Sequence, residues 1–427
     1  MATTLLLTLL LTIRLSSIAS SQSKVQTFTY VNNGEFGPYV SEYGADYRVL
    51  PVAASPFQLA FYNTTPGEFY LALRMGTVRS ESVFRWVWEA NRGRPVRDNA
   101  TFSLLPDGNL VLSDADRRIV WSTDTAHRGV VGLKIVPGGN VVLYDAKNRF
   151  VWQSFDHPTD TLLVGQSLNL VAGPKKLVSR RSTADGSFGT YSLVLSSGGL
   201  TLFMNDNLTY YNYSDGLLSF SSNSVTFECG PETEDAFAYE LRLATGQGTI
   251  ILARPKYDAK LSFLRLEIDG NLAAYTYYDP VDYRAWEKTF ALFSDEIGLL
   301  STCALPQKCG EFGVCEDEMC VACPSTGGLM GWSKKCAPPP PPRRCHSGAA
   351  AAADYYEVVG VESFVSAYMG GEGRVGVEEC RRRCRVRCTC EGFAYWEEEG
   401  RCWLAPVLGT LRKVENSSHV VYVKYYK

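Results

Sequence analysis

The chain has 427 residues, of which 20% are charged, and its net charge is −3. This length suggests about three domains, and such balanced charge provides no global attraction to nucleic acid or to an anionic membrane. The 24 Tyr, 20 Phe, 8 Trp and 37 Gly residues are typical of many short strands joined by tight turns.

Residues 1–21 have the pattern of a secretory signal peptide. An apolar run over Leu5–Ile13 is followed by Arg14 and by a stretch of small residues, which is the order of a hydrophobic region and a cleavage site. A membrane anchor is the alternative, but the run is too short to cross a bilayer of about 30 Å. We therefore expect a secreted protein without a membrane-spanning segment.

Two further features of the sequence agree with secretion. Each Asn-x-Ser/Thr sequon of a secreted chain is a candidate site for an N-linked glycan. The sequons begin at Asn63, Asn99, Asn207, Asn212 and Asn416. Twelve of the 13 Cys residues lie after residue 300, as expected of disulfide scaffolds in an oxidising compartment.

Residues 40–168 contain an internal repeat. Trp88, Trp121 and Trp152 recur at spacings of 33 and 31 residues, and each closes a short strand-like run. A turn with Gly-Asn between apolar residues precedes the second and third Trp, and such turns indicate hairpins. The repeat predicts three copies of a four-stranded sheet whose Trp side chains meet on a shared axis.

Three motifs in this region resemble the bulb-type, mannose-binding lectin domain. They are VWEANR at residues 87–92, LPDGNLVL at residues 105–112 and VWQSFDHPTDTLL at residues 151–163. The resemblance implies a three-sided β-prism, which agrees with the threefold Trp period. Residues 175–292 are also strand-rich, and their Asp269-Gly270-Asn271 turn with Trp286 downstream resembles a second, more divergent prism of the S-locus type.

Two disulfide-rich segments follow the second prism. Residues 300–337 resemble a small EGF-like module, and they hold Cys303, Cys309, Cys315, Cys320, Cys323 and Cys336, whose pairing stays open. Residues 338–344 form a Pro-rich linker that holds the next domain away. Residues 345–427, which include a helix predicted from residue 377 to residue 384, resemble the PAN/apple domain.

The resemblance to the PAN/apple domain also implies a disulfide pattern. It pairs Cys380 with Cys402, Cys384 with Cys390 and Cys345 with Cys388, which leaves Cys229 as a single buried thiol. The predicted fold class is therefore all-β, with two β-prisms, an EGF-like disulfide module and an α+β PAN/apple domain. The whole order resembles the epidermis-specific secreted glycoproteins of plants.

The sugar pocket of bulb-type lectins is a strand with the pattern Gln-x-Asp-x-Asn-x-Val-x-Tyr, whose five side chains share one face. The resemblance carries this pattern onto three stretches of the chain. They are Leu105, Asp107, Asn109, Val111 and Ser113; Val136, Gly138, Asn140, Val142 and Tyr144; and Glu267, Asp269, Asn271, Ala273 and Tyr275. The first two copies each lack two hydrogen-bonding groups, a loss of roughly 2–3 kcal/mol, whereas the third keeps most of them. The alternative for the first two copies is that their Asn turns only stabilise hairpins, and the third copy is the best remaining candidate.

Catalytic and metal-binding motifs are absent from the sequence. The His residues, at 127, 157, 346 and 419, fall in no known catalytic or zinc motif. The Cys320–Cys323 spacing suits zinc or redox chemistry, but disulfide bonding is favoured beside so many other Cys residues. An Arg-rich run over residues 381–387 could bind an acidic polymer such as pectin, although neighbouring Glu residues favour a solvated helix face. We expect no catalytic residue, metal or cofactor.

These features predict a secreted glycoprotein of the cell wall or apoplast that binds mannose-type glycans, with the PAN domain as a docking or self-association module. The alternative is that the prisms have lost sugar binding and contact other proteins, such as receptor ectodomains. A hydrolase is a third hypothesis. Neither nucleic acid nor a membrane is an expected partner.

Overall fold

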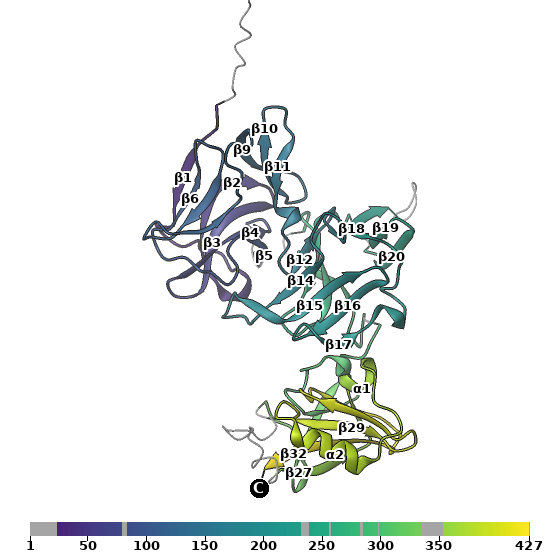
Figure 1. Cartoon of the computed structure of the whole chain (residues 1–427). Helices are drawn as coiled ribbons and strands as arrows, with labels where there is room; N and C mark the ends of the chain where they lie inside the picture. Colours follow the sequence, from purple (N-terminus) through teal and green to yellow (C-terminus); the bar gives the residue numbers. More distant parts are fainter. Residues whose placement is uncertain are drawn as a thin grey trace, which may run out of the picture.

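The structure is a computed structural model that describes residues 24–78, 83–231, 239–255, 258–281, 285–297, 299–334, 336 and 353–426. The predicted signal peptide, the Pro-rich linker, Cys345 and His346 lie outside the described residues. Two β-rich bodies lie side by side, and a smaller C-terminal body lies against the second (Figure 1). The all-β fold class is confirmed.

Three antiparallel sheets form the first prism. In the described part of the chain, two of these sheets have four strands and the third has three. The strands are β1 (Phe28–Val31), β6 (Thr101–Leu104), β7 (Leu110–Ser113) and β8 (Ile119–Ser122); β2 (Asp46–Ala54), β3 (Phe57–Thr65), β4 (Glu68–Met75) and β5 (Arg85–Glu89); and β9 (Val130–Ile135), β10 (Val141–Asp145) and β11 (Phe150–Gln153).

The three Trp residues of the repeat converge at the centre of this prism, as predicted. Their ring centroids lie 6.1 Å (Trp88–Trp121), 6.1 Å (Trp88–Trp152) and 5.7 Å (Trp121–Trp152) apart, with edge-to-face geometry in each pair. Each Trp pairs across its sheet with a fully buried Leu, and a register shift follows each pair. The threefold period therefore reflects one packing unit used on three sides.

The second prism has the same architecture. Its strands are β12 (Thr161–Leu163), β21 (Ser262–Leu266), β22 (Leu272–Tyr277) and β23 (Trp286–Ala291); β13 (Ser167–Asn169), β18 (Ser224–Pro231), β19 (Tyr239–Thr245) and β20 (Gly248–Ala253); and β14 (Lys176–Arg180), β15 (Phe188–Ser196), β16 (Gly199–Met204) and β17 (Leu208–Tyr211). β12 and β13 fall in the range expected for the first prism, yet they pair with β21 and β18. Because the chain enters the second prism directly after β11, the third sheet of the first prism has three rather than four strands among the described residues.

The Cys-rich segment and the last domain form one unit. β24 (Val314–Glu316) pairs in parallel with β31 (Leu411–Lys413), so strands from both share a sheet. The other members of that sheet are β25 (Met319–Ser325), β26 (Gly328–Gly331) and β28 (Val361–Ser363). A segment so short buries little apolar surface by itself, and the shared sheet supplies the missing partner.

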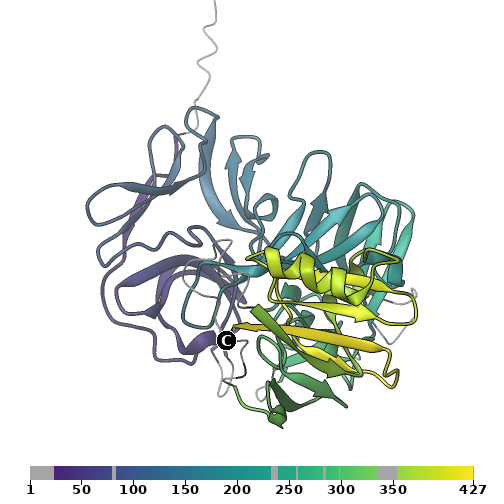
Figure 2. The same ribbon diagram turned by 60° about the horizontal axis from the view of Figure 1, so that its bottom comes forward.

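The rest of the C-terminal unit is a second sheet with two helices. The elements are β27 (Ala353–Val359), β29 (Gly392–Trp396), β30 (Arg401–Ala405), β32 (His419–Tyr426), α1 (Phe364–Tyr368) and α2 (Val377–Val386). The predicted helix is confirmed as α2 and continues two residues further. Figure 2 shows this unit in front of the second prism, where α1 packs on β17 and one hydrophobic core continues across the boundary.

Disulfides hold both parts of the C-terminal unit. They join Cys303 to Cys315, Cys309 to Cys320, Cys323 to Cys336, Cys380 to Cys402 and Cys384 to Cys390. The last two are the pairs that the PAN/apple resemblance implies. Cys388 is disulfide-bonded, and its expected partner Cys345 lies outside the described residues. Among the described Cys residues, Cys229 is free and half-buried, and burial raises the pKa of its thiol to about 11.

No helix in the described part of the chain is both long and apolar enough to span a membrane. The sequons occupy different environments. Asn99, Asn207 and Asn416 are exposed and Asn212 is half-buried, whereas Asn63 lies within β3 and is only 6% exposed.

Candidate functional site

The first predicted sugar strand begins in a tight turn. Asp107 Oδ1 accepts a hydrogen bond from the backbone N–H of Asn109 at 2.9 Å, which is the geometry of an Asx turn. Asn109 Oδ1 in turn accepts from the backbone N–H of Thr125 at 3.1 Å, and Val111 is buried. These groups tie the turn to the chain that follows Trp121.

The second predicted strand has the same arrangement. Asn140 Nδ2 donates to Gln153 Oε1 at 2.9 Å, and its Oδ1 accepts from the backbone N–H of Phe155 at 3.3 Å. Val142 is fully buried, and the ring of Tyr144 is half-buried beneath the ammonium group of Lys134. The Asn side chain again joins its turn to the chain that follows a central Trp.

The third predicted strand, in the second prism, is the most buried. Asn271 Nδ2 donates to Phe293 O at 2.7 Å, its Oδ1 accepts from Phe293 N–H at 3.1 Å, and Asp269 Oδ1 accepts from Asn271 N–H at 2.9 Å. Tyr275 is 9% exposed. Burial raises the pKa of Glu267, although the charge of Arg265 opposes the shift.

The three copies lie on three different sheets, so the structure does not bring them together. Each of the three Asn residues makes an equivalent contact: its side-chain oxygen accepts a hydrogen bond from the backbone just after the end of another strand. A role in sugar binding at these strands stays a prediction, and the hairpin alternative explains the hydrogen bonds of all three Asn side chains.

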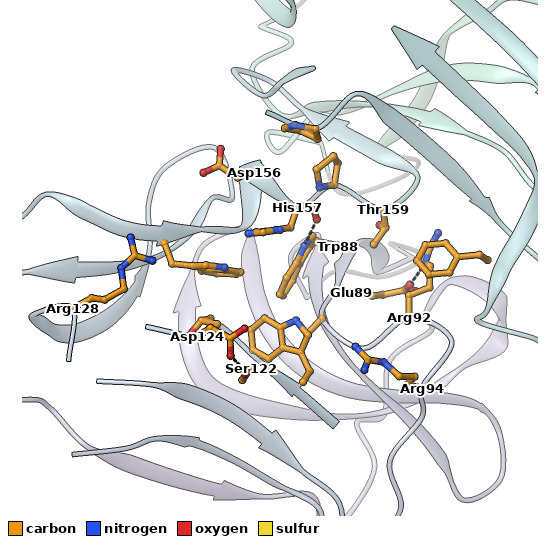
Figure 3. Close-up of a pocket in the computed structure, with 17 residues that line it drawn as sticks. Trp88, Glu89, Arg92, Arg94, Ser122, Asp124, Arg128, Asp156, His157 and Thr159 are labelled. Carbon is orange, nitrogen blue, oxygen red and sulfur yellow. Dashed lines mark hydrogen bonds and ion pairs between the residues drawn. The ribbon is translucent and has the colours of Figure 1, made fainter. Parts of the chain in front are cut away.

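A separate pocket of about 680 Å³ opens at one end of the Trp cluster (Figure 3). Trp88 Nε1 donates to His157 O at 2.9 Å, and the imidazole of His157 stacks on Trp152, with centroids 5.3 Å apart and planes 13° apart. Trp121 is half-buried. The lining therefore offers aromatic surface to the solvent. We call this cavity the axial pocket.

Polar side chains surround the aromatic lining of the axial pocket. Figure 3 shows Arg128 and Asp156 on one side of the Trp88 indole and Arg94 on the other. Asp124 accepts a hydrogen bond from Ser122 Oγ, and its backbone is left-handed with a φ of 54°. Burial lowers the pKa of His157, against an opposing contribution from Asp156, so the ring favours its neutral form.

The back wall of the axial pocket is a buried ion cluster between the prisms. Arg92 Nη2 lies 2.8 Å from Asp160 Oδ2, and Arg92 also pairs with Glu89; the side chains of all three are at most 4% exposed. Arg180 of the second prism lies 3.3 Å from Glu89 Oε1. Burial alone would raise the pKa of Asp160, but the charges of Arg92 and Arg265 outweigh it and hold that pKa below its usual value.

A second contact of the same kind joins the prisms nearby. Arg265 Nη1 lies 2.8 Å from Glu42 Oε1, and its Nη2 donates to Trp86 O at 2.6 Å. Trp286 Nε1 donates to Val83 O at 2.8 Å, so this Trp faces the first prism rather than the axis of the second. We call Glu42, Glu89, Arg92, Asp160, Arg180 and Arg265 the interprism cluster.

Neither the interprism cluster nor the axial pocket was predicted from the sequence. The signal was present, because Glu89, Arg92 and Asp160 are charged residues within the motifs VWEANR and VWQSFDHPTDTLL. A buried charge needs a partner, and Glu89 and Arg92, which pair with each other, find further partners in Arg180 and Asp160. Within the described residues, no group of three His, Cys, Asp or Glu side chains is placed to hold a metal ion.

Comparison with known proteins places these features in a family. Residues 85–183 match the family described as D-mannose binding lectin. EP1-like glycoprotein 2 of Arabidopsis thaliana is 45% identical over 99% of both chains. The epidermis-specific secreted glycoprotein EP1 of Daucus carota is 53% identical over 73% of this chain and 87% of its own.

A more distant relative is a G-type lectin S-receptor-like serine/threonine-protein kinase of Arabidopsis thaliana. It is 27% identical over 81% of this chain and 43% of its own length. The family shown by the nearer relatives agrees with the prism fold and with the resemblance found in the sequence. The chain belongs to the family of EP1-like, epidermis-specific secreted glycoproteins, and it contains a bulb-type lectin domain.

Proposed function

We propose that this protein is an extracellular, lectin-like glycoprotein of the cell wall or apoplast that binds mannose-type glycans without catalysing a reaction. Its signal-like N-terminus and its relatives, which are named secreted glycoproteins, support the location. The family name of its lectin domain supports the sugar class.

The observation that carries the proposal is the composition of the axial pocket. Ligand pockets combine apolar surface with a few converging polar groups. A sugar ring presents C–H groups that pack on aromatic faces and hydroxyls that need hydrogen-bond partners. Trp121 and His157 supply aromatic surface, and Asp124, Asp156 and Arg128 supply donors and acceptors at the rim.

A glycan array followed by titration calorimetry tests this proposal. Asp124→Asn keeps a residue that tolerates the left-handed backbone but removes the charge, and it should lower affinity for mannose-terminated glycans about tenfold. Asp116→Asn is the matched control, because this exposed carboxylate lies in the turn between β7 and β8, outside the pocket. No binding to any glycan, or equal losses in the two variants, would contradict the proposal.

Protein contact through the C-terminal unit is a second candidate function. β26 is an edge strand of its sheet, and Leu329 and Met330 on it are 63% and 64% exposed. Exposed apolar edge strands are ready surfaces for association. Sedimentation of the purified protein alone and with receptor ectodomains, compared with that of Met330→Glu, tests this candidate.

A further inference from the structure

A second pocket lies on the second prism, close to the axial pocket. Its volume is about 540 Å³. The lining comes from β14 through Lys176 and Val178, from the start of β15, and from the turn that contains Asn205 and Asp206. We call this cavity the lateral pocket.

Phe188 lines both pockets. It begins β15 and is 50% exposed, although a Phe side chain loses free energy when it faces water. The Arg92 guanidinium lies 6.0 Å from its ring centroid, and the ring lies against Gly93 of the first prism. Phe188 therefore stands at the junction of the two prisms as an apolar platform shared by the two cavities.

The interprism cluster holds the two pockets in a fixed relation. Arg92 lines the axial pocket, and its Nη1 donates at 3.1 Å to the carbonyl oxygen of Val178, which lines the lateral pocket. Phe188 pairs across its sheet with Arg180, whose guanidinium is bonded to Glu89 and Tyr62. A ligand that spans the pockets would meet a site that needs little reorganisation, which favours affinity.

The balance of charged side chains in the two pockets indicates whether such a ligand is neutral or charged. Apart from the paired Glu89 and Arg92, the described lining of the axial pocket carries Asp124 and Asp156 against Arg94 and Arg128. The lateral pocket carries Lys176 and Asp206, whose charged atoms lie 3.7 Å apart. Neither pocket has a clear excess of one sign, so a neutral chain suits this surface better than a polyanion such as pectin.

We propose that the glycan recognised by this protein is a neutral chain that runs from the axial pocket across Phe188 into the lateral pocket. This inference rests on the proposed lectin function and specifies its ligand as an oligosaccharide rather than a single sugar. It assigns Phe188 as the stacking platform at the middle of the chain.

Linear manno-oligosaccharides from one sugar to six are the probe, titrated into the purified full chain. All proteins carry Asn207→Gln, which removes a sequon beside Asp206 and so keeps an attached glycan away from the lateral pocket. The hexasaccharide should bind about tenfold more tightly than the monosaccharide. In Phe188→Ala that ratio should fall close to one.

Phe150→Ala is the matched control, because Phe150 is 49% exposed on the first prism and lines neither pocket. Its affinity ratio should equal that of the parent protein. Asp206→Asn keeps a residue that tolerates the left-handed backbone found there and should reduce hexasaccharide affinity several-fold. Thermal unfolding of each variant checks that the fold is retained.

The outcomes separate this inference from the function on which it rests. Equal affinity for all chain lengths in the parent protein would overturn the inference while leaving a single-sugar lectin. Unchanged chain-length dependence in Phe188→Ala would also overturn it. Absence of binding at every length would remove the proposed function itself.

Discussion

The two prisms share an architecture but differ at their centres. In the first prism, Trp88, Trp121 and Trp152 each pair with a buried Leu on the neighbouring strand, next to a register shift. The same register positions in the second prism hold Tyr211, Phe290 and Ala253. These smaller side chains join a hydrophobic core that continues into the C-terminal unit.

The difference shows that the same fold can form a pocket at its centre or a core that joins neighbouring domains. In the first prism, three indoles meet around an axis, and a pocket with a polar rim opens at one end of them. In the second prism, the central side chains belong to a core that continues into the C-terminal unit. The second prism still contributes to the lining of the axial pocket, through Phe188. Five changes would break or sharpen this comparison.

The largest expected effect is the loss of a charge between the prisms. Arg92→Ala leaves Glu89 and Asp160 buried without their shared partner, so the free energy of unfolding should fall by about 3–5 kcal/mol. Urea denaturation measures this change. Arg181→Ala is the control, because Arg181 pairs with Asp185 at an exposed site, where the two side chains are 64% and 48% exposed, and its loss should cost no more than about 1 kcal/mol. Similar losses in both variants would show that the cluster contributes little.

The next prediction compares one substitution at the centre of each prism by its effect on stability and on glycan affinity. Phe290→Ala should lower the free energy of unfolding by about 3–5 kcal/mol and leave glycan affinity unaltered. Trp121→Ala should lower affinity about tenfold or more, with a smaller stability loss because Trp121 is only half-buried. Calorimetric titration and urea denaturation of both variants provide the comparison. A loss of affinity in Phe290→Ala would contradict the assigned division of roles.

Asn271→Ala tests the third predicted sugar strand against the hairpin alternative. The variant leaves both backbone groups of Phe293 without their side-chain partner, so we expect a loss of about 1–3 kcal/mol of stability and unchanged glycan affinity. Stability and affinity are measured on the same preparation. If affinity disappears while stability holds, the sugar site lies on this strand.

A smaller effect depends on pH. Because burial depresses the pKa of His157 below its unfolded value of about 6.5, protonation favours the unfolded chain. Stability from this group is therefore complete above the unfolded pKa and is lost as the pH falls from there through the folded pKa. His157→Gln should lose less stability than the parent protein between pH 7 and pH 5, as measured by urea denaturation. Equal losses would show that His157 titrates normally.

The smallest expected effect concerns glycosylation. Asn63 is 6% exposed within β3 of the first prism, which leaves no room for a glycan, whereas Asn99, Asn207 and Asn416 are exposed. Peptide mapping by mass spectrometry should find Asn63 unmodified, and Asn63→Gln should leave the mass of the glycoprotein unchanged apart from the substitution. A glycan at Asn63 would mean that β3 is more accessible than the structure shows.

Local patterns predicted a large part of the fold. The spacing of Trp88, Trp121 and Trp152 and the turns before them are properties of short segments, and they were enough to predict three sheets around a shared Trp axis. The resemblance to bulb-type lectins then implied the three-sided prism. The end of the first prism was misplaced, because β12 looks like any other strand until its partner, β21, is known. The candidate strands around Asn109, Asn140 and Asn271 were predicted, but the backbone groups that hydrogen-bond to these side chains could not be predicted from the sequence.

The sequence by itself predicted a secretion signal, and it determined the prism repeat, the family and the positions of the Cys residues. Only the tertiary structure decided that the motif charges face each other across the prisms, that the Trp cluster opens into a pocket and that Phe188 lies between two cavities. The physical reason is distance along the chain. Arg92 meets Asp160 across 68 residues and Arg180 meets Glu89 across 91, and no local pattern specifies which buried charge will find which partner.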